Sequence, residues 1–343
     1  MSEKILVTGG TGYIGSHTVV ELQQSGYEVL IVDNLANSEE SIVGQIEKIT
    51  GVRPHFTQLD LSERQPTLDY FKQHNNIAGV IHFAAYKAVG ESTEFPLKYY
   101  QNNLGSLANL MEAMALVNCK NLVFSSSCTV YGQPDVLPVT ESAPIKKALS
   151  PYGNTKQVSE EIIFDQCLTG KVEAIALRYF NPIGAHPTAL IGELPLGVPN
   201  NLVPFITQTA IGKRDKLRVF GDDYNTPDGT CIRDYIHVVD LAKAHVVAME
   251  RLTQGKNLER FEVFNLGTGN GFSVLEVIQT FEKVNSLNLN YEIAPRRPGD
   301  VEQVWAETTR ANEVLGWKAE LGLEPMLQSA WKWELYLKEK ATP

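Results

Sequence analysis

The sequence predicts an α/β protein with a doubly wound parallel sheet, followed by a smaller carboxyl-terminal α/β lobe. Short apolar strands alternate with helical patterns over residues 1–180, and a glycine-rich turn follows the first strand. Beyond residue 181 the alternation gives way to segments rich in proline, glycine and asparagine. Strands that alternate with helices form parallel sheets, which bind ligands at the carboxyl ends of their strands.

The first half contains the elements of such a sheet in order. Residues 4–8 are apolar and β-branched, which is typical of a buried strand that leads into a turn and a helix. The same order then repeats along the chain, as in a Rossmann-type sheet. We expect strands at 28–33, 55–59, 79–83 and 121–124, and helices at 39–50, 64–73, 96–117 and 152–168.

The second half loses this regular alternation. Prolines and glycines are frequent between residues 182 and 199, and long irregular segments in compact proteins are usually binding loops. Because 343 residues exceed what one hydrophobic core usually serves, we expect two domains, 1–180 and 181–343. Regular elements return at 202–212, 238–252, 262–266 and 324–338, and residues 236–267 are expected to pack back on the first domain.

The composition argues against several classes of protein. The formal net charge of −10 does not suit a nucleic-acid-binding or anionic-membrane surface. The four cysteines lie singly, without a C-x-x-C pair or a histidine cluster, so we expect no metal site and free thiols in a reducing cytosol. The amino terminus leads into a strand without a signal-peptide pattern, and no apolar run approaches ~18 residues. We therefore expect a cytoplasmic protein that binds neither membranes nor nucleic acids.

The glycine-rich turn, Gly9-Gly10-Thr11-Gly12-Tyr13-Ile14-Gly15, predicts a dinucleotide site. Glycines let backbone amides approach a pyrophosphate, and the dipole of the following helix favours it. Asp33, at the end of the second strand, can accept from both hydroxyls of an adenosine ribose and would repel a 2′-phosphate, while Asn34 beside it carries no charge. The cofactor is therefore predicted to be NAD. Asp60 and Leu61 follow the third strand and could flank the adenine; the alternative for Asp60 is a helix cap.

Tyr152-Gly153-Asn154-Thr155-Lys156 places a phenol and an ammonium on one face of a predicted helix. A cation within reach lowers the pKa of a phenol by roughly 1–3 units from ~10, which favours a general base. The alternative is a solvated pair on an exposed helix. One of the serines at 125–127, at the end of a strand, would complete a serine–tyrosine–lysine proton relay for an alcohol under oxidation. We expect Tyr152 to ionise more readily beside the positive charge of NAD⁺ than beside NADH.

Longer motifs extend this pattern over nearly the whole chain. They are Ser-Ser-Ser-Cys-Thr-Val-Tyr-Gly at 125–132, Ser-Pro-Tyr-Gly-Asn-Thr-Lys at 150–156, Arg-Tyr-Phe-Asn-Pro-Ile-Gly-Ala-His at 178–186, Pro-Asn-Asn-Leu at 199–202, Arg-Asp-Tyr-Ile-His-Val at 233–238 and Arg-Arg-Pro-Gly-Asp at 296–300. These motifs resemble the extended short-chain dehydrogenase/reductase family, and within it the UDP-sugar 4-epimerases. The resemblance implies an NAD-binding domain over 1–180, a UDP-sugar-binding domain over 181–343, and a homodimer formed by helices 96–117 and 152–168. It also implies interconversion of UDP-glucose and UDP-galactose by inversion at C4 through a transient 4-keto sugar.

The resemblance also implies a role for each candidate residue. Tyr152 would remove the proton of the sugar 4-hydroxyl, Lys156 would hold the nicotinamide ribose, and Ser127 would hydrogen-bond the sugar oxygen. The implied NAD contacts are Gly9, Gly12, Tyr13, Ile14, Gly15, Asp33, Asn34, Asp60, Leu61, Phe83, Ala84, Lys87, Asn102, Tyr152, Lys156 and Tyr179. The implied substrate contacts are Ser127, Thr129, Tyr152, Asn181, Asn201, Leu202, Arg233, Arg297, Asp300 and Val304. Guanidinium groups suit a pyrophosphate. Lys87 could instead be a solvated loop lysine, and each arginine a surface salt bridge.

Val304 bears on which sugars are accepted. In the resembling enzymes this position, immediately before a tryptophan, carries either a tyrosine, which crowds C2 of the sugar, or a smaller residue. Val304 could therefore admit an N-acetyl group, so that UDP-GlcNAc and UDP-GalNAc are also interconverted. The alternative is that Val304 is ordinary pocket packing.

Three other functions would use the same cofactor site. A nucleotide-sugar 4,6-dehydratase needs an acid pair just after the serine, where this chain has Cys128 and Thr129. A non-catalytic NAD-sensing regulator usually lacks the tyrosine or the lysine, and both are present. A net dehydrogenase would accumulate NADH, whereas an epimerase shows no net redox change.

Overall fold

The computed structural model describes residues 3–297 and 300–341. Its larger sheet is fully parallel and has the strand order β10-β6-β5-β4-β1-β2-β3. Its strands are β1 (Lys4–Thr8), β2 (Glu28–Asp33), β3 (His55–Gln58), β4 (Ile77–His82), β5 (Asn121–Ser127), β6 (Glu173–Tyr179) and β10 (Phe261–Leu266). The predicted doubly wound parallel sheet is therefore confirmed. The direction of winding reverses between β1 and β4, which is where such sheets bind their ligands.

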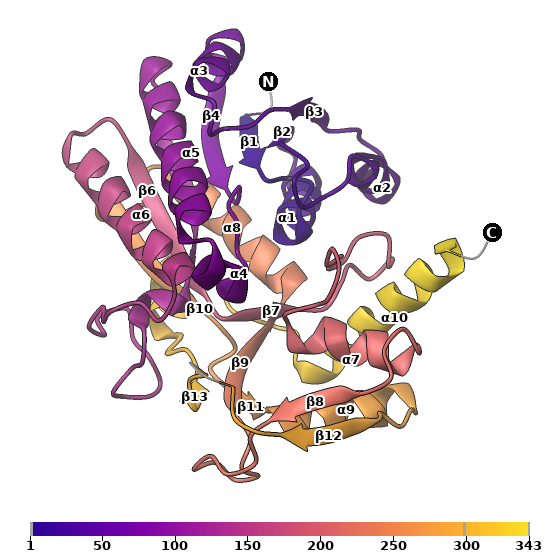
Figure 1. Cartoon of the computed structure of the whole chain (residues 1–343). Coiled ribbons are helices and arrows are strands. Elements are labelled where there is room, and N and C mark those ends of the chain that lie inside the picture. Colours follow the sequence, from indigo (N-terminus) through magenta and orange to yellow (C-terminus); the bar gives the residue numbers. More distant parts are fainter. Residues whose placement is uncertain (1–2, 298–299, 342–343) are drawn as a thin grey trace.

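Helices cover both faces of this sheet, because its strands are apolar on both sides (Figure 1). In β1, Ile5 and Val7 pack toward one face and Leu6 toward the other, since successive side chains of a strand alternate. One face holds α1 (Tyr13–Gln24), α2 (Ser41–Thr50) and α8 (Val238–Thr253), and the other holds α3 (Arg64–Gln73), α5 (Pro96–Leu116) and α6 (Pro151–Leu168). The short helix α4 (Val89–Glu94) precedes α5, and a 3₁₀ turn, η1 (Cys128–Tyr131), follows β5.

The second half of the chain contributes to the large sheet. β10 pairs with β6 at the edge of that sheet, and α8 packs against α1. Leu315 and Trp317, in and just after the π-helical turn η2 (Ala311–Leu315), also lie in this hydrophobic core. The chain therefore leaves the large sheet after β6 and returns to it twice.

The smaller lobe combines short strands with helices. β7 (Asn181–Ile183), β9 (Ile232–His237), β11 (Gly271–Ser273) and β13 (Gln303–Val304) form one sheet, and β8 (Leu217–Phe220) pairs with β12 (Tyr291–Ala294). Around them pack α7 (Leu202–Ala210), α9 (Val274–Asn285) and α10 (Leu323–Ala341), with Ile206, Phe281 and Leu327 in the core. The predicted smaller α/β lobe is thus present.

Sequence patterns did not predict β6, β9, α4, α9 or the short strands of this lobe. Strands of two to four residues contain too little alternation to be recognised. The start of α9 did carry a signal, because Ser273 and Glu276 form a capping box.

Candidate active site

The glycine-rich turn joins β1 to α1 under tight steric limits. Gly9 has φ of +71°, and a Cβ atom there would lie 2.8 Å from the Ala84 nitrogen. At Gly15 a Cβ would lie 2.2 Å from the Gly9 oxygen, so neither position accepts a side chain without a shift of the backbone. Helix α1 begins at Tyr13 after Gly12. This turn at a helix amino terminus fits the pyrophosphate of a dinucleotide.

Asp33 closes the turn that follows β2. Its Oδ1 accepts from the Leu35 nitrogen at 2.9 Å and the Ser38 hydroxyl at 3.2 Å, and its Oδ2 accepts from the Thr11 nitrogen at 3.2 Å. The carboxylate therefore lies beside the glycine-rich turn. Ile14, the second residue of α1, packs against the core on the face of the large sheet that α1, α2 and α8 cover.

Asp60 lies beside Asn34, so the ends of β2 and β3 are joined by their polar side chains. Asp60 Oδ2 accepts from Asn34 Nδ2 at 3.1 Å, and Oδ1 accepts from the Ser62 nitrogen at 2.8 Å. Because α3 begins later, with Glu63 at the cap position, Asp60 forms a local turn and is not a helix cap. Leu61 is buried in the core of the large sheet.

The segment after β4 brings further predicted NAD contacts to the same edge. The Ala84 nitrogen donates to Thr8 Oγ1 at 3.5 Å, and the Phe83 ring packs against His245 at 4.7 Å between centroids. Lys87 Nζ lies 3.5 Å from Glu193 Oε1 and 5.9 Å from the centre of the Tyr13 ring. Lys87 is thus exposed but not free of contacts.

Asn102 lies on α5 next to Asn103, a buried residue that the sequence patterns did not identify. Asn102 Nδ2 donates to Asn103 Oδ1 at 2.9 Å. Asn103 is buried, accepts from the Tyr86 nitrogen at 2.9 Å, and donates to Thr155 Oγ1 at 3.1 Å. It therefore fixes the β4–α5 connection against α6. No sequence signal marks Asn103, because its partners are 17 and 52 residues away.

The predicted relay residues lie together where β5 ends and α6 begins. Lys156 Nζ donates to the Ser125 carbonyl at 2.6 Å and lies 5.9 Å from the centre of the Tyr152 ring. Ser127 Oγ accepts from the Thr129 nitrogen at 3.2 Å, and this side chain lowers the pKa of Tyr152, which places it near the phenol. Tyr179 and Ser125 share a hydrogen bond between their hydroxyls. Ser150 caps α6 and accepts from the Gly153 nitrogen at 3.1 Å, which sets where Tyr152 and Lys156 fall on the helix.

The pKa values of these groups differ from those expected from sequence. Burial, together with Tyr179, raises the pKa of Tyr152, although hydrogen bonding with Ser127 lowers it. Burial lowers the pKa of Lys156 to about 8, against the opposing effect of Glu160. In the protein by itself, desolvation of the phenolate is the largest effect and raises the pKa of Tyr152, so the lowering expected from Lys156 does not appear.

Four of the predicted uridine-diphosphate contacts lie on elements of the smaller lobe. Asn181 is the first residue of β7, directly after β6, and Asn201 and Leu202 begin α7. Asn201 Nδ2 donates to Glu193 Oε1 at 2.8 Å. Glu193, which the sequence patterns missed, thus contacts a predicted NAD ligand and a predicted substrate ligand. Arg233 on β9 donates to the Ile232 and Glu302 carbonyls at 2.9 and 3.4 Å.

Arg297 and Asp300 pair with each other. Arg297 Nη2 lies 2.8 Å from Asp300 Oδ1, and the Arg297 side chain is 55% exposed. Its guanidinium also lies 5.6 Å from the centre of the Phe220 ring. The surface salt bridge that was the alternative interpretation is therefore present, and no contact places Arg297 beside Arg233.

Val304 and Thr129 lie at or near η1, the turn that follows Ser127. Val304 is adjacent to Arg233 in the β13–β9 pair and is buried with Tyr131 and Phe180. The Thr129 hydroxyl is buried and has no hydrogen-bond partner within residues 3–297 and 300–341, so it fits a donor or acceptor on a bound sugar. Among the same residues, no group of three or more His, Cys, Asp or Glu side chains could hold a metal ion.

Comparison with known proteins agrees with this geometry. Residues 5–267 match the NAD dependent epimerase/dehydratase family. The chain is 50% identical to the UDP-glucose 4-epimerase of Yersinia enterocolitica over 331 residues, which cover 96% of this chain and 97% of that protein.

Two crystal structures of UDP-glucose 4-epimerases are similar to this chain. The one from Stenotrophomonas maltophila, with bound NAD and formylated UDP-arabinopyranose, has a TM-score of 0.95 and 47% identity, covering 98% of this chain and 99% of that chain. The one from Bifidobacterium longum, in complex with NAD⁺ and UDP, has a TM-score of 0.92 and 45% identity, covering 97% and 98%. The chain belongs to the NAD-dependent epimerase/dehydratase family.

Proposed function

We infer that this protein is an NAD-dependent enzyme that interconverts UDP-glucose and UDP-galactose by inversion at C4 of the hexose, through a transient 4-keto sugar. The observation that carries this inference is the meeting of Tyr152, Lys156 and Ser127 at the carboxyl end of β5, on the sheet edge that also carries the glycine-rich turn, in a chain 50% identical to a UDP-glucose 4-epimerase. Bound NAD supplies the chemistry of hydride acceptance and return at C4. The protein supplies binding, orientation and movement of one proton.

The relay residues act on the C4 oxygen. Tyr152 removes the proton of the 4-hydroxyl. After the 4-keto sugar has turned its opposite face toward the nicotinamide, Tyr152 returns the proton to the C4 oxygen. Ser127 hydrogen-bonds the same oxygen, which supports charge as it develops there. Lys156, whose ammonium is fixed by the Ser125 carbonyl, holds the nicotinamide ribose.

The remaining candidate residues divide between the two lobes. NAD is proposed to lie along the carboxyl ends of β1, β2, β4 and β5, with its pyrophosphate at the glycine-rich turn and its adenosine ribose at Asp33. The uridine diphosphate is proposed to contact Asn181, Asn201, Leu202, Arg233 and the Arg297–Asp300 pair. This division is supported by Glu193, which contacts Lys87 on one side and Asn201 on the other.

The alternative activities lack required groups. Elimination by a 4,6-dehydratase needs an acid pair next to the serine, and Cys128 and Thr129 of η1 occupy those positions. Burial raises the pKa of the Cys128 thiol to about 12, so this thiol is not a replacement acid near neutral pH. A regulator without activity has no need for an intact relay.

We also propose that the protein acts in the cytoplasm. All four cysteines are free thiols, which is typical of a reducing compartment. In the described part of the chain, no helix is long and apolar enough to span a membrane. Fractionation of cells against compartment markers tests this location.

A first prediction concerns Tyr152. Purified protein without added NAD is expected to convert UDP-galactose into UDP-glucose, because an enzyme with no net redox change can retain its cofactor. Tyr152→Phe should lower kcat by about 10²–10⁴-fold, since the relay loses its proton carrier. Tyr70→Phe is the matched control, because Tyr70 is also a buried phenol but lies on α3. Stoichiometric NADH instead of UDP-glucose would identify a net dehydrogenase.

A second prediction concerns the charge of the cofactor. Burial raises the pKa of Tyr152, and a positive nicotinamide ring nearby should oppose this effect. The phenol is expected to titrate at lower pH with NAD⁺ than with NADH. Ultraviolet difference absorbance of phenolate, with Tyr152→Phe protein subtracted, measures both values. Equal pKa values in the two states would contradict the prediction.

A third prediction concerns Val304 and the substituent at C2. We expect the protein to interconvert UDP-GlcNAc and UDP-GalNAc as well as the hexoses, because valine leaves more space than tyrosine. Val304→Tyr should abolish turnover of the N-acetyl sugars while UDP-galactose, the internal control, is still converted. Wild-type protein that converts only UDP-galactose would favour the alternative that Val304 is ordinary pocket packing.

A fourth prediction concerns assembly. We propose a homodimer formed by α5 and α6, which lie side by side and expose Leu97, Leu116, Phe164 and Leu168. Light scattering is expected to give twice the chain mass of 38.0 kDa. Leu168→Glu should give monomers, whereas Leu258→Glu, at an exposed leucine outside these helices, should not. A monomeric wild-type protein would contradict this proposal.

A further inference from the structure

A row of buried polar side chains crosses the large sheet one residue before the relay. Ser126, Arg178 and Asn265 occupy matching positions on β5, β6 and β10, and are 0%, 6% and 0% exposed. The next residues in the same β5–β6 register are Ser127 and Tyr179. Buried polar groups are costly without partners, so the contacts of this row need an explanation.

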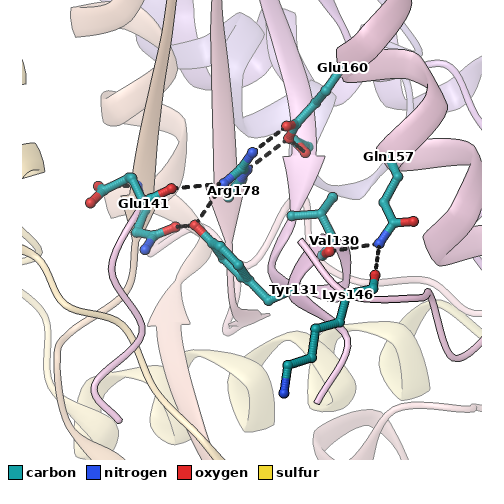
Figure 2. Close-up of polar contacts among 9 residues, drawn as sticks. Val130, Tyr131, Glu141, Lys146, Gln157, Glu160 and Arg178 are labelled. Carbon is teal, nitrogen blue, oxygen red and sulfur yellow. Dashed lines mark hydrogen bonds and ion pairs between the residues drawn. The ribbon is translucent and has the colours of Figure 1, made fainter. Parts of the chain in front are cut away.

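Glu160 of α6 lies against this row and binds two of its members. Its Oε1 accepts from Ser126 Oγ at 2.5 Å. Figure 2 shows its pairing with Arg178, in which Oε1 accepts from Nε at 2.9 Å and Oε2 accepts from Nη2 at 2.5 Å. Both charged side chains are less than a tenth exposed. Removing one member of such a buried bidentate pair leaves the other charge uncompensated.

Arg178 of this ion pair also contacts η1, the turn that follows Ser127. Arg178 Nη1 donates to the Tyr131 hydroxyl of η1 at 3.0 Å, and that hydroxyl donates to Asn265 Oδ1 at 2.6 Å (Figure 2). Asn265 Nδ2 in turn donates to the Val139 carbonyl at 2.9 Å. The network therefore links β5, α6, β6 and β10 through the residues next to the relay.

This network also extends to the segment that carries Val304. The Val139 nitrogen donates to the Trp305 carbonyl, next to Val304, at 2.9 Å.

A second contact joins α6 to η1. Gln157, the residue after Lys156, donates to the Val130 carbonyl at 2.8 Å and the Lys146 carbonyl at 2.6 Å (Figure 2). The helix that carries Tyr152 and Lys156 is thus held against η1 at two successive turns.

Glu160 also determines the charge balance at Lys156. From β5 the ammonium meets the Phe124 ring at 4.8 Å and the Ser125 carbonyl, and from β4 it faces His82. On its own helix it meets Tyr152 and Glu160. Arg178 of β6 lies beyond Glu160. Burial lowers the pKa of Lys156, and the Glu160 carboxylate opposes this effect. Burial and the Lys156 charge lower the pKa of His82 to about 3, so His82 is neutral at physiological pH.

We propose that Glu160 and Arg178 are positioning residues for the relay. Their ion pair fixes the end of β5 against α6 through Ser126, and it holds the Glu160 carboxylate one helical turn from Lys156. This inference rests on the proposed function, because the relay it serves is that of the 4-epimerase reaction. Glu160 and Arg178 act through Ser126 and Lys156 and take no part in proton transfer themselves.

A comparison of two glutamates tests the proposal. Glu262 forms a similar bidentate pair with Arg251, at 2.7 and 2.9 Å, and is 1% exposed. That pair lies between the end of α8 and the start of β10, at the opposite end of the sheet from the relay. Glu160→Gln and Glu262→Gln therefore make the same chemical change in similar surroundings, and both should lower the urea midpoint of unfolding.

Only Glu160→Gln is expected to change the reaction. Its kcat for UDP-galactose should fall by about 10–100-fold, because small displacements of reacting groups have effects of this size. The alkaline limb of its pH–rate profile should move about 1 unit toward lower pH, since Lys156 loses its proton more readily without the carboxylate. The KM for UDP-galactose should stay near its wild-type value.

A milder variant keeps the test decisive if Glu160→Gln does not fold. Ser126→Ala leaves the ion pair intact and removes its hydrogen bond to β5, so kcat should fall about 2–10-fold without a shift of the alkaline limb. If Glu160→Gln matches Glu262→Gln in kcat and pH profile per folded molecule, or if folded Ser126→Ala keeps wild-type kcat, the proposal is wrong. Wild-type turnover in the same assay tests the proposed function separately.

Discussion

The buried ammonium of Lys156 is the constraint on which the rest of the active site depends. The residue is 5% exposed, and a charge removed from water is strongly destabilising unless other groups replace its hydration. Here the Ser125 carbonyl at 2.6 Å, the Phe124 ring at 4.8 Å and the Glu160 carboxylate do so. Two of these groups belong to β5 and one to α6, so strand and helix must meet in one relative position for Lys156 to be accommodated.

The parallel sheet makes that position rigid. Ser127 and Tyr179 are neighbours because β5 and β6 run side by side in register, and the hydrogen bond between Ser125 and Tyr179 joins the same strands. Two residues after Tyr179, Asn181 begins β7 in the smaller lobe. A single short stretch of chain therefore passes from the proposed cofactor side to the proposed substrate side, which limits how far the two ligands can move apart.

Local patterns could predict the relay and all strands of the large sheet except β6, because these features are encoded at short range. The strand, glycine-rich turn and helix around Gly9, and the i and i+4 spacing of Tyr152 and Lys156, lie within a few residues of each other. The contacts of Glu193 could not be predicted, since Lys87 lies 106 residues away from it in the sequence. The pKa of Tyr152 could not be predicted for a related reason: it depends on burial by residues from several elements, which no local pattern specifies.

Burial also separates the charged groups in and next to the relay from those proposed to contact the two ligands. The Lys87 and Arg297 side chains are each about half exposed and pair with Glu193 and Asp300. Exposed ion pairs contribute only about 0–1 kcal/mol, so these cations can exchange a carboxylate for a phosphate at little cost. Lys156 and Arg178 cannot exchange partners in this way, because their carbonyl and carboxylate partners are buried with them. The exposed cations thus suit ligands that enter and leave, and the buried ones suit a relay that must keep one geometry through both halves of the reaction.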